Sequence, residues 1–169
     1  MFSTALPRYA FRDTTDISPD FLKALGVRFL MLDLDNTVAA YSERRLAEDV
    51  SSWAANIRDC GVGLFLITNS MKKPRVDTFA EALDIGFLKG ARKPSPKSLL
   101  QTMESVGFLP GESALVGDQI FTDTIAANRA GIISIIVHPR RLMNPILALR
   151  YAVETPFRAA CKNKMWDIT

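Results

Sequence analysis

The chain has 169 residues, of which 48% are hydrophobic and 23% charged, and its formal net charge is +3. This length and balance predict a single globular domain over residues 1–169, and they exclude a disordered or fibrous chain. The mild positive charge permits contact with an anionic surface but gives no indication of nucleic-acid binding.

Cysteine usage and hydropathy bear on the location of the protein. Cys60 and Cys161 lie far apart and in no metal-ligand spacing, which predicts two reduced thiols rather than a disulfide. The first residues lack the apolar core of a signal peptide, and no apolar run reaches the ~18 residues that a membrane span needs. We therefore expect a cytoplasmic protein, for which peripheral contact with the inner face of the membrane stays open.

Along the chain, residues 1–27 are expected to form a leader in which Ser18 caps a short helix over residues 19–25. From Arg28 onward, short apolar runs alternate with helical stretches, which is the rhythm of an α/β sheet. Five runs are too short for core helices and apolar on both faces, as buried parallel strands are: residues 28–34, 62–68, 85–88, 112–118 and 133–138.

The intervening segments complete the expected catalytic core, which spans residues 28–138. Helices are expected over residues 43–59, 74–83, 96–106 and 122–130. Because crossovers between parallel strands are right-handed, these elements predict a doubly wound, Rossmann-like parallel sheet.

Beyond Pro139 the alternation stops, and residues 139–169 form a basic tail that we expect to be helical. Its cations are interleaved with apolar residues: Arg140, Arg141, Arg150, Arg158, Lys162 and Lys164 alternate with Leu142, Ile146, Leu149, Phe157 and Trp166. One interpretation is docking on anionic lipid. The other is a helix that packs on the sheet and exposes its charged face to solvent.

The strongest local signal follows the first apolar run, in Asp33-Leu34-Asp35-Asn36-Thr37. An open α/β sheet places its ligand crevice at this edge. Two ionised carboxylates so close together repel each other, which indicates a cation between them or a shared proton. Mg²⁺ is a cation that takes oxygen ligands together with phosphate. Taken alone, the segment could also be a polar turn.

Polar residues also follow the next three runs. Thr68 and Asn69 follow the second, Lys93 follows the third, and Asp118 and Asp123 follow the fourth. Each group alone has an ordinary explanation, as turn chemistry, a solvated loop charge or a helix N-terminus. Because the carboxyl ends of parallel strands meet at one edge, we expect all of them to converge on one crevice.

In this order, the four groups resemble the four motifs of the haloacid dehalogenase (HAD) superfamily. The resemblance implies that Asp33 is a nucleophile that forms an aspartyl-phosphate and that Asp35 is the general acid and base. It also implies that Thr68 and the Asn69 backbone bind the phosphoryl group, while Lys93 neutralises charge on Asp33 and the phosphate.

The same resemblance implies a Mg²⁺ site. Asp33, Asp118 and the backbone carbonyl of Asp35 would hold the metal, and Asp123 would support either the metal or Lys93. An acid at position 35 indicates a phosphatase or phosphotransferase, because HAD dehalogenases and transport ATPases carry none there.

The spacing of the motifs leaves no room for a cap domain. Only a short flap and one helix fit between Thr37 and Val62, and only one helix fits between Ser70 and Gly86. An open crevice favours a substrate that is large, surface-bound, or enclosed by a neighbouring subunit of an oligomer.

A narrower resemblance is to the YqeG-like group of HAD subfamily IIIA, which includes phosphatidylglycerophosphate phosphatases. The segments that carry it are Leu6-Pro7, residues 17–22, residues 32–38, Ala91-Arg92-Lys93-Pro94, Gly117-Asp118-Gln119, Thr122-Asp123 and residues 128–131. It implies hydrolysis of phosphatidylglycerophosphate, a phosphorylated lipid headgroup, to phosphatidylglycerol. Two alternatives stay open: a phosphatase of soluble sugar phosphates or nucleotides, and a non-catalytic HAD-fold regulator that binds a protein partner.

Overall fold

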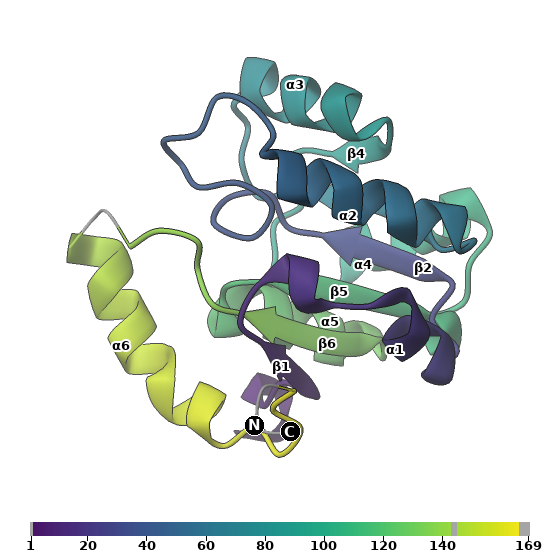
Figure 1. The fold of residues 1–169 in the computed structure, drawn as a ribbon. Coiled ribbons are helices and arrows are strands. Elements are labelled where there is room, and N and C mark those ends of the chain that lie inside the picture. The colour runs from purple at the N-terminus through teal and green to yellow at the C-terminus, as the bar shows by residue number, and fades with distance from the viewer. Residues whose placement is uncertain (1, 143–144, 166–169) are drawn as a thin grey trace.

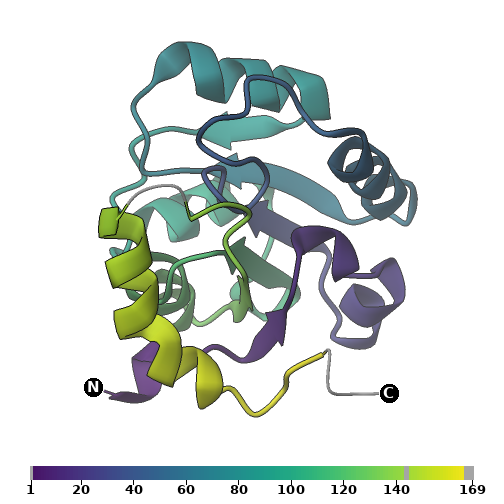
Figure 2. The same ribbon diagram turned by 60° about the vertical axis from the view of Figure 1, so that its left-hand side comes forward.

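One all-parallel sheet organises the computed structural model, which describes residues 2–142 and 145–165. The sheet has six strands in the order β1-β6-β5-β2-β3-β4, and helices cover both of its faces (Figures 1 and 2). The strands are β1 (Tyr9–Phe11), β2 (Phe29–Leu32), β3 (Gly63–Ile67), β4 (Gly86–Leu88), β5 (Ser113–Gly117) and β6 (Ile133–Val137). The doubly wound α/β class that the sequence predicts is confirmed.

The central strands are buried because helices pack on both of their faces. Every residue of β2, β5 and β6 is buried. On one face α1 (Pro19–Ala24), α2 (Glu48–Asp59) and α3 (Lys73–Leu83) contribute to the larger hydrophobic core. On the other face α4 (Lys97–Val106) and α5 (Ile125–Ala130) form the second core.

The predicted helices are present, with shifted starts. Ser18 caps α1 as expected, since its hydroxyl accepts a hydrogen bond of 3.1 Å from the Phe21 N–H. The helix expected from residue 43 begins only at Glu48, because residues 37–47 form an irregular flap over the sheet edge. The helix expected over residues 122–130 is split into a π-helical turn, Ile120–Thr124, and α5.

The prediction of five strands was incomplete, because the expected leader contributes a sixth. β1 pairs in parallel with β6, and Tyr9 lies opposite Ile135. The apolar run Tyr9-Ala10-Phe11 is too short to identify a strand in the sequence, so its long-range partners define it. On its other side, the Met165 N–H donates to the Ala10 carbonyl at 2.9 Å, and the Ala10 N–H donates to the Asn163 carbonyl at 3.0 Å.

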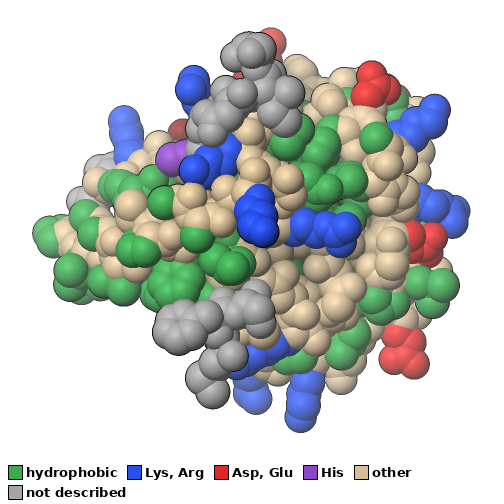
Figure 3. Space-filling model, turned by 90° about the horizontal axis from the view of Figure 1, so that it is seen from below, with side chains coloured by type: hydrophobic (Ala, Val, Ile, Leu, Met, Phe, Trp, Pro, Cys, Tyr) green, Lys and Arg blue, Asp and Glu red, His purple; other side chains and the backbone are tan. Residues whose placement is uncertain are grey.

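The basic tail forms α6 (Pro145–Ala159), which stands at the side of the molecule (Figure 1). Its polarity is inverted relative to an ordinary surface helix. Glu154 and Arg158 are buried against the body, whereas Ile146, Leu149 and Val153 are 74%, 67% and 54% exposed. Hydrophobic side chains accordingly gather on the lobe at the left of Figure 3. No helix in the described part of the chain is both long and apolar enough to cross a membrane.

The buried strands should dominate stability. We expect Leu66→Ala, at a fully buried position of β3, to lower the free energy of unfolding by about 2–5 kcal/mol, because it leaves a cavity in a close-packed core. Leu109→Ala removes the same atoms from an exposed side chain and should change stability by less than about 0.5 kcal/mol. Urea denaturation of both variants measures the difference, and equal effects would contradict this description of the core.

Candidate active site

The seven residues that the sequence predicts for the site all lie at one edge of the sheet. Asp33, Thr68 and Asp118 each come directly after a strand, namely β2, β3 and β5. Lys93 and Asp123 reach the same edge from the segments after β4 and β5. A crevice of about 270 Å³ lies there, lined by Asp33, Asp35, Tyr41, Thr68, Asn69, Ser70, Lys93, Gln119, Thr122, Asp123 and Arg150. Asp118 lines an adjoining recess.

Lys93 is the central cation of this site and is only 4% exposed. Its Nζ lies 2.7 Å from Asp33 Oδ1, 2.7 Å from Asp123 Oδ1 and 2.9 Å from the Ile67 carbonyl oxygen. The Asn69 side chain fixes the backbone at Lys93, because its amide donates to the Lys93 carbonyl at 2.9 Å and its oxygen accepts from the Lys93 N–H at 2.8 Å. The Asn69 side chain therefore positions the backbone of Lys93, and the phosphoryl contact expected of Asn69 is through its own backbone.

Burial and crowding shift the ionisation of these groups. Burial raises the pKa of Asp33 to about 7; Lys93 opposes the shift, while Asp123 and Asp35 add to it. Burial, Asp33 and Asp123 raise the pKa of Asp118 well above its usual value. Burial alone would lower the pKa of Lys93, but Asp123 and Asp33 outweigh it and raise that pKa. The site thus holds more carboxylates than its one buried lysine can neutralise.

The carboxylates fit a hard divalent cation. One ligand oxygen from each of Asp33, Asp118 and Asp123 lies within 4.8 Å of the others. Asp118 Oδ1 is buried and accepts no hydrogen bond from any described residue, so it has a vacant lone pair for a metal. Asp123 is already engaged, by Lys93 through Oδ1 and by the Gln119 N–H through Oδ2 at 3.1 Å. This favours Asp33 and Asp118 as the direct ligands and Asp123 as their support.

Asp35 has a partner that sequence reasoning missed. Its Oδ1 accepts a hydrogen bond from Arg75 Nε at 2.9 Å. The Asp35 side chain does not belong to the cluster of Asp33, Asp118 and Asp123, so the metal contact expected of Asp35 is through its backbone carbonyl. The same guanidinium donates to the Ala40 carbonyl at 2.8 Å and also bonds the Glu43 carbonyl. Arg75 thereby ties α3, the flap and Asp35 together. In the sequence, only the position of Arg75 near the start of the helix that follows Thr68 indicated that it could reach the site.

The second missed feature is the anchor of α6. Arg158 donates to the Val137 carbonyl at 2.9 Å and to the carbonyl of Asp118. Glu154 accepts from Arg158 at 3.3 Å through Oε2 and from the Phe121 N–H at 3.2 Å through Oε1. The tail helix is therefore fixed to the loop that carries Asp118.

Two of the expected docking cations are consequently used inside the fold. Arg158 is buried in the anchor, and Arg140 is paired with Asp13 at 3.0 Å and with Asp49 at 3.3 Å. Arg141, Lys162 and Lys164 remain at or near the surface, and Arg150 lines the crevice.

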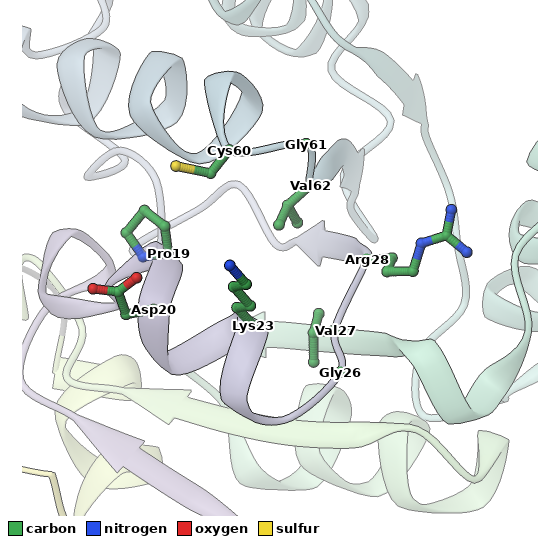
Figure 4. Close-up of a pocket in the computed structure, with 9 residues that line it drawn as sticks. All are labelled: Pro19, Asp20, Lys23, Gly26, Val27, Arg28, Cys60, Gly61 and Val62. Atoms are coloured by element: carbon green, nitrogen blue, oxygen red, sulfur yellow. The ribbon is translucent and has the colours of Figure 1, made fainter.

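A larger groove of about 460 Å³ lies at the opposite edge of the sheet, beside the starts of β2 and β3 (Figure 4). Its ionisable residues, Asp20, Lys23, Arg28 and Cys60, are all exposed. Because none of these groups is buried or forced close to another carboxylate, we assign the chemistry to the smaller crevice.

Comparison with known proteins agrees with this assignment. Residues 90–139 match the model of the HAD-hydrolase-like family. The chain is 28% identical to a probable phosphatase, YqeG, of Bacillus subtilis over 134 residues, which cover 79% of this chain and 77% of that protein.

Solved structures show the same fold. A putative HAD family hydrolase from Streptomyces avermitilis superposes with a TM-score of 0.58 at 17% identity, covering 82% of this chain and 75% of that one. The 3-deoxy-D-manno-octulosonate 8-phosphate phosphatase of Moraxella catarrhalis, solved with magnesium and phosphate ions, gives a TM-score of 0.53 at 16% identity, covering 81% and 92%.

The fold, the site and these similarities together support a HAD-type phosphatase: the chain is similar to HAD hydrolases in sequence over residues 90–139 and in fold over most of its length. Its similarity in sequence to the probable phosphatase YqeG extends over 134 residues. Mg²⁺ is the cofactor of such phosphatases, and the all-oxygen group of Asp33, Asp118 and Asp123 fits it.

Metal binding should stabilise the protein, since a ligand that binds only the folded state adds about 2.7 kcal/mol at 100 times its Kd. We expect Mg²⁺ to raise the Tm of the wild type. In Asp118→Asn the increase should be lost, while the metal-free variant stays at least as stable as the wild type because one buried like charge is gone.

Differential scanning fluorimetry with and without Mg²⁺ measures both effects. Asp59→Asn, a change at an exposed carboxylate of α2, is the matched control and should respond to Mg²⁺ like the wild type. An undiminished Mg²⁺ response in Asp118→Asn would exclude Asp118 as a ligand.

Proposed function

We propose that this HAD-type phosphatase hydrolyses phosphatidylglycerophosphate through an aspartyl-phosphate on Asp33. The observation that carries the phosphatase chemistry is the buried group of Asp33, Lys93 and Asp123, which opens into a crevice that Asp35 and Thr68 also line. The lipid assignment rests on the open crevice, on the outward apolar face of α6 beside it, and on the resemblance to the YqeG-like group.

In the first half-reaction, a carboxylate oxygen of Asp33 attacks phosphorus and the ester P–O bond breaks. Asp35 gives its proton to the leaving alkoxide. In the second, water attacks the phosphorus, the bond from phosphorus to Asp33 breaks, and Asp35 takes the proton of that water. Orthophosphate then leaves and Asp33 is restored. Bound Mg²⁺ would offset the negative charge of the phosphoryl oxygens.

The chain supplies the remaining contacts to the phosphoryl group. The Thr68 hydroxyl oxygen accepts from the Ser70 N–H at 3.1 Å, so its own proton is free to be donated to a phosphoryl oxygen. Lys93 is held against Asp33 and brings positive charge to the site of attack. Arg75 holds Asp35 and the flap in one arrangement, so it acts as a positioning residue for the acid.

The open crevice favours a substrate presented by a surface. Residues 33–47, between β2 and α2, contain no helix or strand, and α3 is the only helix between β3 and β4. Nothing in these described segments covers the crevice as a cap domain would. A phosphomonoester at the end of a lipid headgroup could enter such a crevice from a membrane surface.

Phosphate release from phosphatidylglycerophosphate in detergent micelles with Mg²⁺ tests this function. We expect turnover by the wild type and a loss of at least about 1,000-fold in Asp33→Asn, because the amide cannot act as the nucleophile. A panel of sugar phosphates and nucleotides is assayed alongside. Turnover of soluble esters alone would keep the HAD chemistry and reject the lipid, and no turnover at all would support the non-catalytic regulator.

We also propose that α6 docks the protein peripherally on the cytoplasmic face of the membrane. Leu149 and Val153 lie on its outer face with Ile146, one helical turn apart, and its single acidic residue, Glu154, is buried. The exposed charges that flank the helix, those of Arg141 and Lys162, are positive. An apolar face bordered by cations complements the surface of an anionic lipid bilayer.

Flotation with vesicles containing phosphatidylglycerol tests the docking. We expect the triple variant Ile146→Ser, Leu149→Ser, Val153→Ser to bind at least about tenfold more weakly than the wild type, since each buried apolar side chain contributes about 1.5–3 kcal/mol. Leu109→Ser, at an exposed leucine next to β5, is the control. Unchanged binding in the triple variant, or its conversion from dimer to monomer, would overturn the membrane assignment.

A further inference from the structure

The catalytic crevice contains two cations, and the reaction described above uses one of them. Among its lining residues these are Lys93 and Arg150. Lys93 is fully engaged by Asp33, Asp123 and the Ile67 carbonyl. Arg150 comes from α6, and the described structure gives it one ion pair, from Nε to Glu154 at 3.5 Å. Its guanidinium therefore keeps Nη donors available to a ligand.

The position of Arg150 is fixed by the anchor of its helix. Glu154, one turn further along α6, holds the Phe121 N–H and Arg158, and Arg158 in turn holds the Asp118 carbonyl. Glu154 is thus shared among several donors and only partly neutralises Arg150. Because α6 is tied to the loop that carries Asp118, Arg150 is placed at the crevice that Asp33 and Lys93 also line.

Tyr41, on the flap, also lines the crevice and has no part in the reaction described. Its side chain is partly exposed. Burial and the charges of Asp35, Asp118 and Asp33 raise the pKa of Tyr41 to about 12, while Arg150 lowers it. The phenol therefore remains a hydrogen-bond donor at neutral pH, within the electrostatic reach of Arg150.

We infer that Arg150 and Tyr41 form a subsite for a second anionic group of the substrate, next to the phosphomonoester that is cleaved. The inference rests on the proposed phosphatase activity and deepens it, because it defines the substrate as a bis-anionic phosphoester. In phosphatidylglycerophosphate the second anion is the phosphodiester that links the headgroup to the lipid. A guanidinium suits this group, since its planar fork can donate two parallel hydrogen bonds to phosphate oxygens.

Two soluble substrates that differ by one phosphate isolate this subsite from any lipid effect. Initial rates of phosphate release are measured for glycerol 1,3-bisphosphate and glycerol 3-phosphate with Mg²⁺. We expect the wild type to prefer the bisphosphate by about tenfold or more in kcat/KM, the range for a charge-assisted hydrogen bond. Arg150→Ala should abolish the preference by raising KM for the bisphosphate, so the ratio of the two kcat/KM values within this variant should fall to about one.

Matched variants distinguish a specific subsite at Arg150 from a general effect of positive charge on the protein. Arg141→Ala removes an exposed arginine that does not line the crevice, and it should keep the preference. Arg150→Lys should keep part of it, and Tyr41→Phe should reduce it less than Arg150→Ala does. If the wild type turned over neither ester, calorimetric binding of both to Asp33→Asn with Mg²⁺ would measure the same preference.

The outcomes distinguish this inference from the proposed function. A preference that depends on Arg150, in a protein that leaves phosphatidylglycerophosphate intact, would support the subsite and reject the lipid substrate. Hydrolysis of the lipid with equal use of both soluble esters would overturn the subsite alone. Equal losses on both esters in Arg150→Ala would also overturn it, because they would show a purely structural role.

Discussion

The buried ammonium of Lys93 is the constraint on which the rest of the site depends. A charge removed from water is tolerated only when partners surround it, and here Asp33, Asp123 and the Ile67 carbonyl do so. Those contacts join segments that follow three different strands. The Asn69 amide then fixes the lysine backbone from the end of β3. The same contacts therefore fix the geometry of the catalytic residues and hold this edge of the sheet together.

The inverted polarity of α6 has the same cause, namely that buried polar groups need partners. The loop after β5 carries Asp118 and exposes backbone groups that need partners once they are buried. Arg158 and Glu154 supply them, so the inner face of α6 is polar. Apolar residues of the helix are left on its outer face, where Leu149 and Val153 are exposed. One helix thus contacts the loop of Asp118 with its inner face and exposes apolar side chains on its outer face.

The sequence was informative wherever a signal is local. The apolar runs located β2 to β6, and the polar residues directly after them located Asp33, Thr68 and Asp118. It was uninformative where only tertiary contacts define the structure. β1 is three residues at an edge, and Arg75 resembles any helix cation until Asp35 is placed beside it. Arg158 was wrongly predicted to be a surface charge, because the sequence does not distinguish a buried arginine from an exposed one.

The backbone bonds between Ala10 and residues 163–165 have a mechanical consequence for the crevice. They cover the outer edge of β1, which would otherwise offer unpaired groups to another chain. They also hold the segment that follows α6, whose last turn is held by Arg158. The placement of α6, and of Arg150 on it, therefore depends on two attachments near the carboxyl end of the helix: the buried Arg158 and the pairing of residues 163–165 with β1. Loosening the outer margin of the sheet would thus disturb a residue that lines the crevice.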